Sequence, residues 1–361
     1  MPRVIPGVLV ALVLAACGGS ATTTTSAVPA TSVTTSTTVA STTTTLPTTT
    51  SEPSTTTTTE PPGPPSPVNG LAVSDPELLD RRVLAVKVDN HPNARPQSGL
   101  QEADAVIELK VEGGITRFIA LFHQSDSAYL GPIRSGRPTD PTLIAPLDAT
   151  FVISGASNWV LAKFRRRGLP FLGESPPATF RISSRKAPHN LYGDTVKLRE
   201  RADRAGFSDE PPDVPYFEFG PLPDDAAEAT SLTFDWAPGN RVTWNWNGEG
   251  YERVVGGEVQ EWLAADGRTG PLVFDTLVVL FGRPYTARPD RPSDGKAVPA
   301  TDVVGTGRAL VAAGGRIVEG RWERRRDTDP FRLTTADGAP LQVPPGKIWI
   351  SVFPQTRQVS W

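Results

Sequence analysis

The pattern of apolar and polar positions divides the chain into four parts. A short apolar run, Pro6–Leu14, lies near the start, and a segment made almost entirely of Thr, Ser and Pro extends from there to about Pro67. Strand-like and helix-like runs then mix up to about residue 225, and short strand-like runs recur from there to the end. We therefore expect four segments with the boundaries 1–16, 17–67, 68–225 and 226–361.

Strands and helices mix irregularly between residues 68 and 225. Glu112-Gly113-Gly114 separates two apolar runs and predicts a hairpin, because glycine readily adopts the positive φ angles of a tight turn. This mixture favours an α+β fold over a doubly wound parallel sheet. Apolar runs predict strands at 81–88, 105–111, 115–122 and 149–154. Periodic segments predict helices at 138–147, 157–167 and 193–204.

Residues 226–361 have a different pattern, in which strand-like runs are separated by turns such as Asp266-Gly267. This pattern predicts an antiparallel β-rich domain. Trp244 and Trp246 alternate along one run and face the same side of the sheet, where packing in a core or at an edge is favoured over stacking on sugar rings. The runs lie at 232–236, 242–246, 251–255, 272–281, 309–312, 316–323, 331–334 and 347–353.

Cys17 is the only cysteine of the chain and follows Leu14-Ala15-Ala16. A basic residue near the start (Arg3), an apolar core too short to cross a bilayer and small residues before the cysteine are typical of a secretory signal. A cysteine at the cleavage position predicts a bacterial lipoprotein, and the alternative is an ordinary signal peptide with a chance cysteine. We expect a mature chain anchored in the cell membrane by lipid (palmitate) and exposed to the extracytoplasmic cell envelope.

The segment 17–67 has almost no large apolar side chains and contains threonine runs such as Thr55–Thr59. Such a segment cannot bury enough apolar surface to offset its ordering entropy, so we expect it to be disordered. Tracts of this composition are typical of O-glycosylated stalks. A flexible coil of about 50 residues has a root-mean-square span of roughly 40 Å, which makes this segment a spacer between the membrane and the folded body.

Composition narrows the chemistry further. A net charge of −3 gives no electrostatic footprint for nucleic acid. One cysteine excludes an intramolecular disulfide and a cysteine-based zinc site, and three histidines argue against a His-rich metal site, so we expect neither a metal nor another cofactor. No second apolar run approaches the roughly 20 residues of a transmembrane helix, which leaves lipid as the expected anchor.

Four polar stretches of the first half hold more charged and amide side chains than a fold requires, at 89–100, 112–118, 131–138 and 183–192. In this combination and order they resemble the YerB-like family of lipoproteins. The resemblance covers essentially residues 71–361. It implies an N-terminal α+β domain of layered sheets and helices and a β-rich C-terminal domain. It implies no established activity and assigns no catalytic residue.

The candidate ligand-binding residues lie in these stretches. Arg134 and Arg137 flank Ser135-Gly136 on a turn that enters a predicted helix, where backbone N–H groups and guanidinium forks bind phosphate or carboxylate. We expect both arginines to meet Arg117 in one concavity, together with charged groups from separate loops, Asp89, Glu112 and His189. The full candidate set is Asp89, Asn90, Arg95, Glu112, Thr116, Arg117, Arg134, Ser135, Arg137, His189 and Asn190.

Other interpretations of these charges remain open. The arginines could instead pair with Glu108, Glu112 or Asp148 and hold the domain together, or be solvated. The carboxylates of Asp89, Glu108 and Glu112 could hold a divalent cation that carries a phosphate, or act as acid and base, or simply cap turns and form salt bridges. The leading hypothesis is a non-enzymatic lipoprotein that binds an anionic or glycan envelope component, such as a wall polymer, or an envelope protein. The alternative is an enzyme that acts on phosphate-bearing envelope precursors.

Overall fold

The computed structural model describes residues 63–361. The predicted signal segment, Cys17 and the stalk up to residue 62 lie outside the described residues. Residues 63–67, which the composition placed in the stalk, belong to the folded body: Ser66 is buried and its amide donates to Leu71 O at 2.8 Å. Among the helices of the described residues, none is long and apolar enough to cross a membrane.

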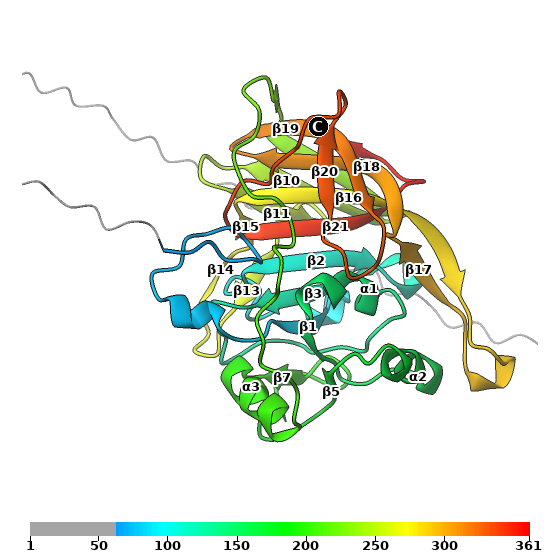
Figure 1. Ribbon diagram of the computed structural model, residues 1–361. Helices are drawn as coiled ribbons and strands as arrows, with labels where there is room; N and C mark the ends of the chain where they lie inside the picture. The colour runs from blue at the N-terminus through cyan, green and yellow to red at the C-terminus, as the bar shows by residue number, and fades with distance from the viewer. Residues whose placement is uncertain (1–62) are drawn as a thin grey trace, which may run out of the picture. The chain divides into compact units, whose positions relative to one another are not determined.

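A mixed sheet of 12 strands forms the centre of the folded body (Figure 1). Most of its strands lie where the sequence pattern predicts strands. Their order is β20 (Arg332–Thr335), β19 (Arg316–Arg324), β18 (Gly305–Ala313), β16 (Thr276–Ala287), β21 (Ile348–Pro354), β2 (Ala105–Lys110), β3 (Thr116–Phe122), β1 (Leu84–Asp89), β4 (Thr150–Val152) and β5 (Phe171–Leu172), with β17 (Val298–Asp302) beside β16 and β8 (Ala227–Glu228) beside β19.

The two halves of the chain share this sheet. β21, from the second half, lies between β16 and β2 and runs parallel to both of them. Its Ile350 is opposite Val278 on one side and Ile107 on the other, and all three side chains are buried. A parallel strand covered on both faces is apolar along nearly its whole length, and β21 is buried throughout and apolar at every position except Ser351. The second half is therefore mostly antiparallel, as predicted, with β21 as the exception.

A smaller sheet of six strands packs on one face of the large sheet and shares a core with it. Its alternating pattern places one face in that core and leaves the other outside. Its order is β12 (Glu258–Val259), β11 (Tyr251–Val255), β10 (Asn240–Trp246), β9 (Ser231–Ala237) and β22 (Val359–Ser360), with β15 (Val273–Phe274) beside β11. Two hairpins complete the strands, β6 (Thr179–Arg181) with β7 (Leu191–Gly193) and β13 (Glu261–Leu263) with β14 (Thr269–Pro271).

Three α-helices cover the large sheet at its first-half end, α1 (Asp140–Ile144), α2 (Asn158–Arg166) and α3 (Thr195–Arg204). Helix α3 contributes to the core that the small sheet shares, whereas α1 and α2 contribute to the core on the opposite face. Asp194 caps α3 by accepting from Lys197 N at 3.3 Å. Gly168 and Gly206 follow α2 and α3 with φ angles of 67° and 72°, which confirms the predicted ends of both helices.

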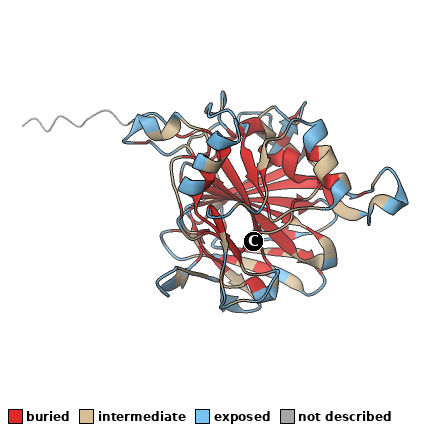
Figure 2. Ribbon diagram, turned by 90° about the horizontal axis from the view of Figure 1, so that it is seen from below, coloured by how far each residue is buried: buried red, intermediate tan, exposed pale blue. Residues whose placement is uncertain are grey.

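The buried strands occupy the centre of the body, and the exposed loops and helix faces surround them (Figure 2). Trp244 is fully buried and contacts Trp349 edge-on, with 5.0 Å between ring centroids. Trp246 is partly buried at the edge of the same core and packs against Tyr251. Packing, not sugar stacking, therefore accounts for this pair.

The end of β1 and the β2–β3 hairpin place the polar residues at one end of the large sheet. Gly113 and Gly114 have φ angles of 69° and 74°, as the predicted hairpin requires. Asp89 is directly opposite Arg117, so both side chains lie on one face of the sheet. Glu108 is opposite Phe118 and faces the other side.

Candidate functional site

Asp89 is a fully buried carboxylate that contacts three donors at the end of β1. Its Oδ1 accepts from the backbone N–H of His91 at 3.1 Å, and its Oδ2 lies 2.7 Å from Nδ1 of His189. Nε of Arg134 lies 2.9 Å from the same Oδ2; this contact is an ion pair without a well-directed hydrogen bond. The rings of His91 and His189 are stacked, with centroids 4.9 Å apart. One carboxylate therefore holds a guanidinium and an imidazole side by side.

Arg117 is buried beside this group, and it pairs with no carboxylate in the part of the chain that the structure describes. Its side chain projects from β3, is 6% exposed, and donates from Nη1 to Ser135 O at 2.9 Å. Its Nε is buried without a hydrogen-bond partner, and no carboxylate of residues 63–361 lies within ion-pair distance. Burial is the main cause that lowers the pKa of Arg117 to about 10, and the charges of Arg137 and Arg134 lower it further against the opposing carboxylates.

Arg137 reaches the same place from the loop before α1. Its Nε donates to Glu112 Oε2 at 2.9 Å, and its backbone N–H donates to Asp140 Oδ2 at 2.6 Å. Partial burial disfavours the charged form of Glu112, but the hydrogen bond from Arg137 and the nearby arginine charges outweigh it, so the pKa of Glu112 is lowered overall. We call Arg117, Arg134 and Arg137 the arginine cluster.

Lys87 and Asp140 belong to this site, although the sequence pattern did not single them out. Both are fully buried, and Nζ of Lys87 donates to Asp140 Oδ1 at 2.7 Å. Burial lowers the pKa of Lys87 to about 8, against the opposing effect of Asp140 and with added repulsion from Arg117 and Arg137. The available signal was a lysine two positions before Asp89 on a strand that is otherwise apolar.

The structure divides the candidate residues into two groups on opposite faces of the large sheet. The arginine cluster, Asp89, Glu112, Ser135 and His189 come together on the face of α1 and α2. Asn90, Arg95 and Thr116 lie with Glu108 in a second network on the other face. Asn190 joins neither group, because its amide contacts Arg181 and Ile182 O.

The second network is buried and connects the two halves of the chain. Glu108 Oε1 accepts from Thr116 Oγ1 at 2.6 Å and from Arg253 Nη2 at 2.7 Å, while Oε2 accepts from Trp349 Nε1 at 3.0 Å. Arg253 is fully buried, and its guanidinium lies 5.1 Å from the ring centroid of Trp349. Burial lowers the pKa of Arg253, although Glu108 opposes the shift.

These contacts decide between the alternatives for the arginines only in part. Arg137 pairs with Glu112, as expected if the arginines hold the domain together. The other two carboxylates of that alternative do not pair with the arginine cluster: Glu108 pairs with Arg253, and Asp148 is an exposed residue with a φ of 43°. Basic groups already contact one oxygen each of Asp89 and Glu112: Asp89 Oδ2 lies beside Arg134 and His189, and Glu112 Oε2 accepts from Arg137. The described residues contain no group of three or more His, Cys, Asp or Glu side chains arranged for a metal ion.

Comparison with protein families matches both halves of the chain. The family described as "Protein of unknown function (DUF3048) N-terminal domain" matches residues 68–208, and the DUF3048 C-terminal domain matches residues 232–350. The chain belongs to the DUF3048 family. The resemblance drawn from the polar stretches is confirmed, and so are the N-terminal and C-terminal domains it implied.

Relatives of this DUF3048 chain include a Bacillus subtilis (strain 168) protein named "Putative lipoprotein YerB". It is 29% identical over 307 residues, which cover 82% of this chain and 88% of that protein. The crystal structure of the YerB protein from Bacillus subtilis superposes with a TM-score of 0.70 at 27% identity, over 82% of this chain and 99% of that one. This likeness confirms the α+β fold with its β-rich second half and relates the chain to a protein named as a lipoprotein.

Proposed function

We propose that this protein is a lipoprotein anchored in the cell membrane through Cys17, and that its arginine cluster binds an anionic group of an extracytoplasmic envelope component. Two observations support the anchor: Cys17 follows a signal-like apolar run, and the relative from Bacillus subtilis is named as a lipoprotein. The ligand group is a phosphate or a carboxylate, because guanidinium groups recognise both through paired hydrogen bonds.

The unpartnered guanidinium of Arg117 is the observation on which this proposal rests. A buried cation beside two like charges is unfavourable unless an anion compensates it. Asp89 and Glu112 already contact Arg134 and Arg137, and Arg117 has no ion pair among residues 63–361. Four cations (Lys87, Arg117, Arg134 and Arg137) face three carboxylates (Asp89, Glu112 and Asp140) here. A bound monoanion would balance this charge.

The contact between His189 and Asp89 favours a second candidate function, that of an enzyme. Its Nδ1 faces Asp89, so a neutral ring with its proton on Nδ1 has a free acceptor at Nε2. A carboxylate that orients an imidazole in this way is the arrangement of a general base. Such a base beside arginines suits an enzyme that acts on phosphate-bearing envelope precursors. Turnover of a generic phosphodiester substrate that His189→Gln abolishes would support this candidate, and no turnover would reject it for such substrates.

Isothermal titration of residues 18–361 with inorganic phosphate and with citrate tests the binding proposal. Arg134→Ala should weaken binding by about 2–5 kcal/mol, as expected when one partner of a buried charge pair is removed. Arg321→Ala is the matched control, because Arg321 is exposed on β19 near the far edge of the large sheet. Equal affinities for Arg134→Ala and the control, or a wild type that binds neither anion, would contradict the proposal.

A further inference from the structure

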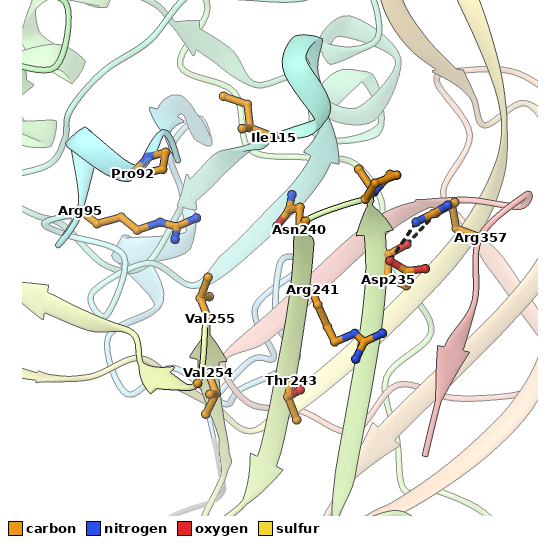
Figure 3. Close-up of a pocket in the computed structure, with 15 residues that line it drawn as sticks. Pro92, Arg95, Ile115, Asp235, Asn240, Arg241, Thr243, Val254, Val255 and Arg357 are labelled. Carbon is orange, nitrogen blue, oxygen red and sulfur yellow. Dashed lines mark hydrogen bonds and ion pairs between the residues drawn. The ribbon is translucent and has the colours of Figure 1, made fainter.

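A cleft of about 810 Å³ lies between two loops of the first half and one end of the small sheet (Figure 3). Pro92, Arg95 and Ile115 form its first-half side. Its other side comes from β9, β10, β11 and the turns at their ends. Asp235, Arg241 and Val254 point away from the shared core, because they alternate with buried residues. Ala237 is buried and Val255 packs against the core, so the cleft also reaches round the end of this sheet. The cleft is thus built from both halves of the chain.

The cleft is positively charged. Arg95, Arg241 and Arg357 line it together with one acidic residue, Asp235. Nη2 of Arg357 lies 2.8 Å from Asp235 Oδ1, and this ion pair is drawn in Figure 3. In residues 63–361, no carboxylate lies at ion-pair distance from Arg95 or Arg241. Two cations of the cleft therefore lack an anionic partner.

Arg95 is held in a fixed orientation before any ligand binds. Its Nε donates to Asn90 Oδ1 at 3.0 Å and its Nη2 donates to Asn90 O at 3.2 Å. Asn90 is itself buried and donates to Thr116 Oγ1 at 2.7 Å. Burial is the main cause that lowers the pKa of Arg95 to about 10, and the charge of Arg253 contributes. A guanidinium positioned in this way binds an anion with a reduced loss of side-chain entropy.

Two loops connect this cleft to the arginine cluster. At the end of β1, Asp89 contacts Arg134, and Arg95 in the loop that follows lines the cleft six residues later. In the β2–β3 turn, Glu112 pairs with Arg137 while Ile115 lines the cleft. The turn also contacts the small sheet, because Gly114 O accepts from Asn240 Nδ2 at 2.9 Å. The two cationic regions are therefore neighbours across one end of the large sheet.

The lining residues indicate how a ligand would be recognised. None of the residues that line the cleft is aromatic, so the cleft offers no ring on which a neutral sugar could stack. Its free charges are arginines, which favour phosphate or carboxylate. We infer that the cleft and the arginine cluster are two parts of one extended site for a linear polyanion with repeated charges. This inference rests on the proposed function of the arginine cluster.

The number of linked phosphate groups in the probe is the variable that tests an extended site. We would titrate residues 18–361 with orthophosphate, pyrophosphate, triphosphate and long-chain polyphosphate as probes. A polyphosphate long enough to reach both the cleft and the arginine cluster should bind about 100-fold or more tightly than orthophosphate, since its second contact becomes intramolecular. The affinity for the long chain should also fall more steeply with salt, because more charges are neutralised.

The variant Arg95→Gln/Arg241→Gln should lower the affinity for long-chain polyphosphate about tenfold or more and lower the affinity for orthophosphate much less, because a single phosphate reaches only one of the two regions. Arg241→Gln alone should show part of this loss, and it keeps the test valid if Arg95→Gln unfolds the protein, because Arg241 is exposed. The matched control is Arg321→Gln/Arg332→Gln, which removes two exposed charges from β19 and β20.

Two results would overturn the inference. One is an affinity that does not rise with chain length, and the other is an equal loss in the cleft variant and in the control. If instead the arginine cluster does not bind anions, Arg134→Ala would leave orthophosphate binding intact, which is a different result from these two. The two proposals can therefore fail separately.

Discussion

Replacing Arg117 with methionine should leave the protein as stable as the wild type or more stable, while abolishing anion binding. Methionine is a flexible apolar side chain that can fill much of the space of the arginine stem. The substitution removes a guanidinium that is 6% exposed and has two arginines as neighbours. It also removes one hydrogen bond, from Nη1 to Ser135 O.

The expected change in the free energy of unfolding follows from the lost buried charge and the lost hydrogen bond. A pKa lowered from the usual arginine value to about 10 means that the fold disfavours charged Arg117 by roughly 3 kcal/mol, at 1.36 kcal/mol per pH unit. Because the folded pKa is the lower one, this penalty is fully present below about pH 10 and disappears only above the unfolded value. A hydrogen bond to a charged group contributes about 1.5–3 kcal/mol. The net change at neutral pH should therefore lie between about 0 and 2 kcal/mol of added stability.

Urea unfolding of residues 18–361, followed by tryptophan fluorescence, would measure this change. Arg253→Met is the contrasting variant, because it also replaces a buried arginine but leaves Glu108 buried without its ion-pair partner. That variant should lose about 3–5 kcal/mol. Addition of phosphate should stabilise the wild type and leave Arg117→Met unaffected. If Arg117→Met lost more than about 2 kcal/mol without ligand, our account of an uncompensated cation would be refuted.

Three further predictions concern other parts of the chain. The free energy of unfolding should rise between about pH 8 and pH 10 in the wild type but not in Lys87→Met. The pKa of Lys87 is lowered to about 8 in the folded protein, so in this pH range the unfolded chain binds a proton at Lys87 that the native state has lost. Urea unfolding at pH 8 and at pH 10 would measure this difference. Cys17→Ala should move the protein from the membrane fraction to the soluble fraction, and unchanged membrane association would contradict the lipid anchor. Deleting residues 18–62 should leave the Tm unchanged, whereas deleting 18–68 should lower it by at least about 3 °C because Ser66 and Val68 are buried; equal Tm values would contradict this boundary.

Local features of this chain could be read from the sequence because each depends on a few neighbouring residues. Two glycines in Glu112-Gly113-Gly114 permit the positive φ angles of the hairpin. Asp194 caps helix α3, which begins at the next residue. The alternation of Trp244 with polar neighbours places its ring in the core. The polar stretches of the first half also identified the family and contain all three residues of the arginine cluster.

Only the tertiary structure decided how these parts combine, because strand order and register bring together residues that are far apart in sequence. β21 joins the two halves by pairing with β2, and no local pattern specifies that partner. Register places Glu108 and Arg117 on opposite faces, so Glu108 pairs with Arg253, and among the described residues Arg117 has no carboxylate partner. The ion pair of Lys87 with Asp140 and the cleft between Arg95 and Arg241 arise in the same way, from contacts that exist only after the strands have assembled.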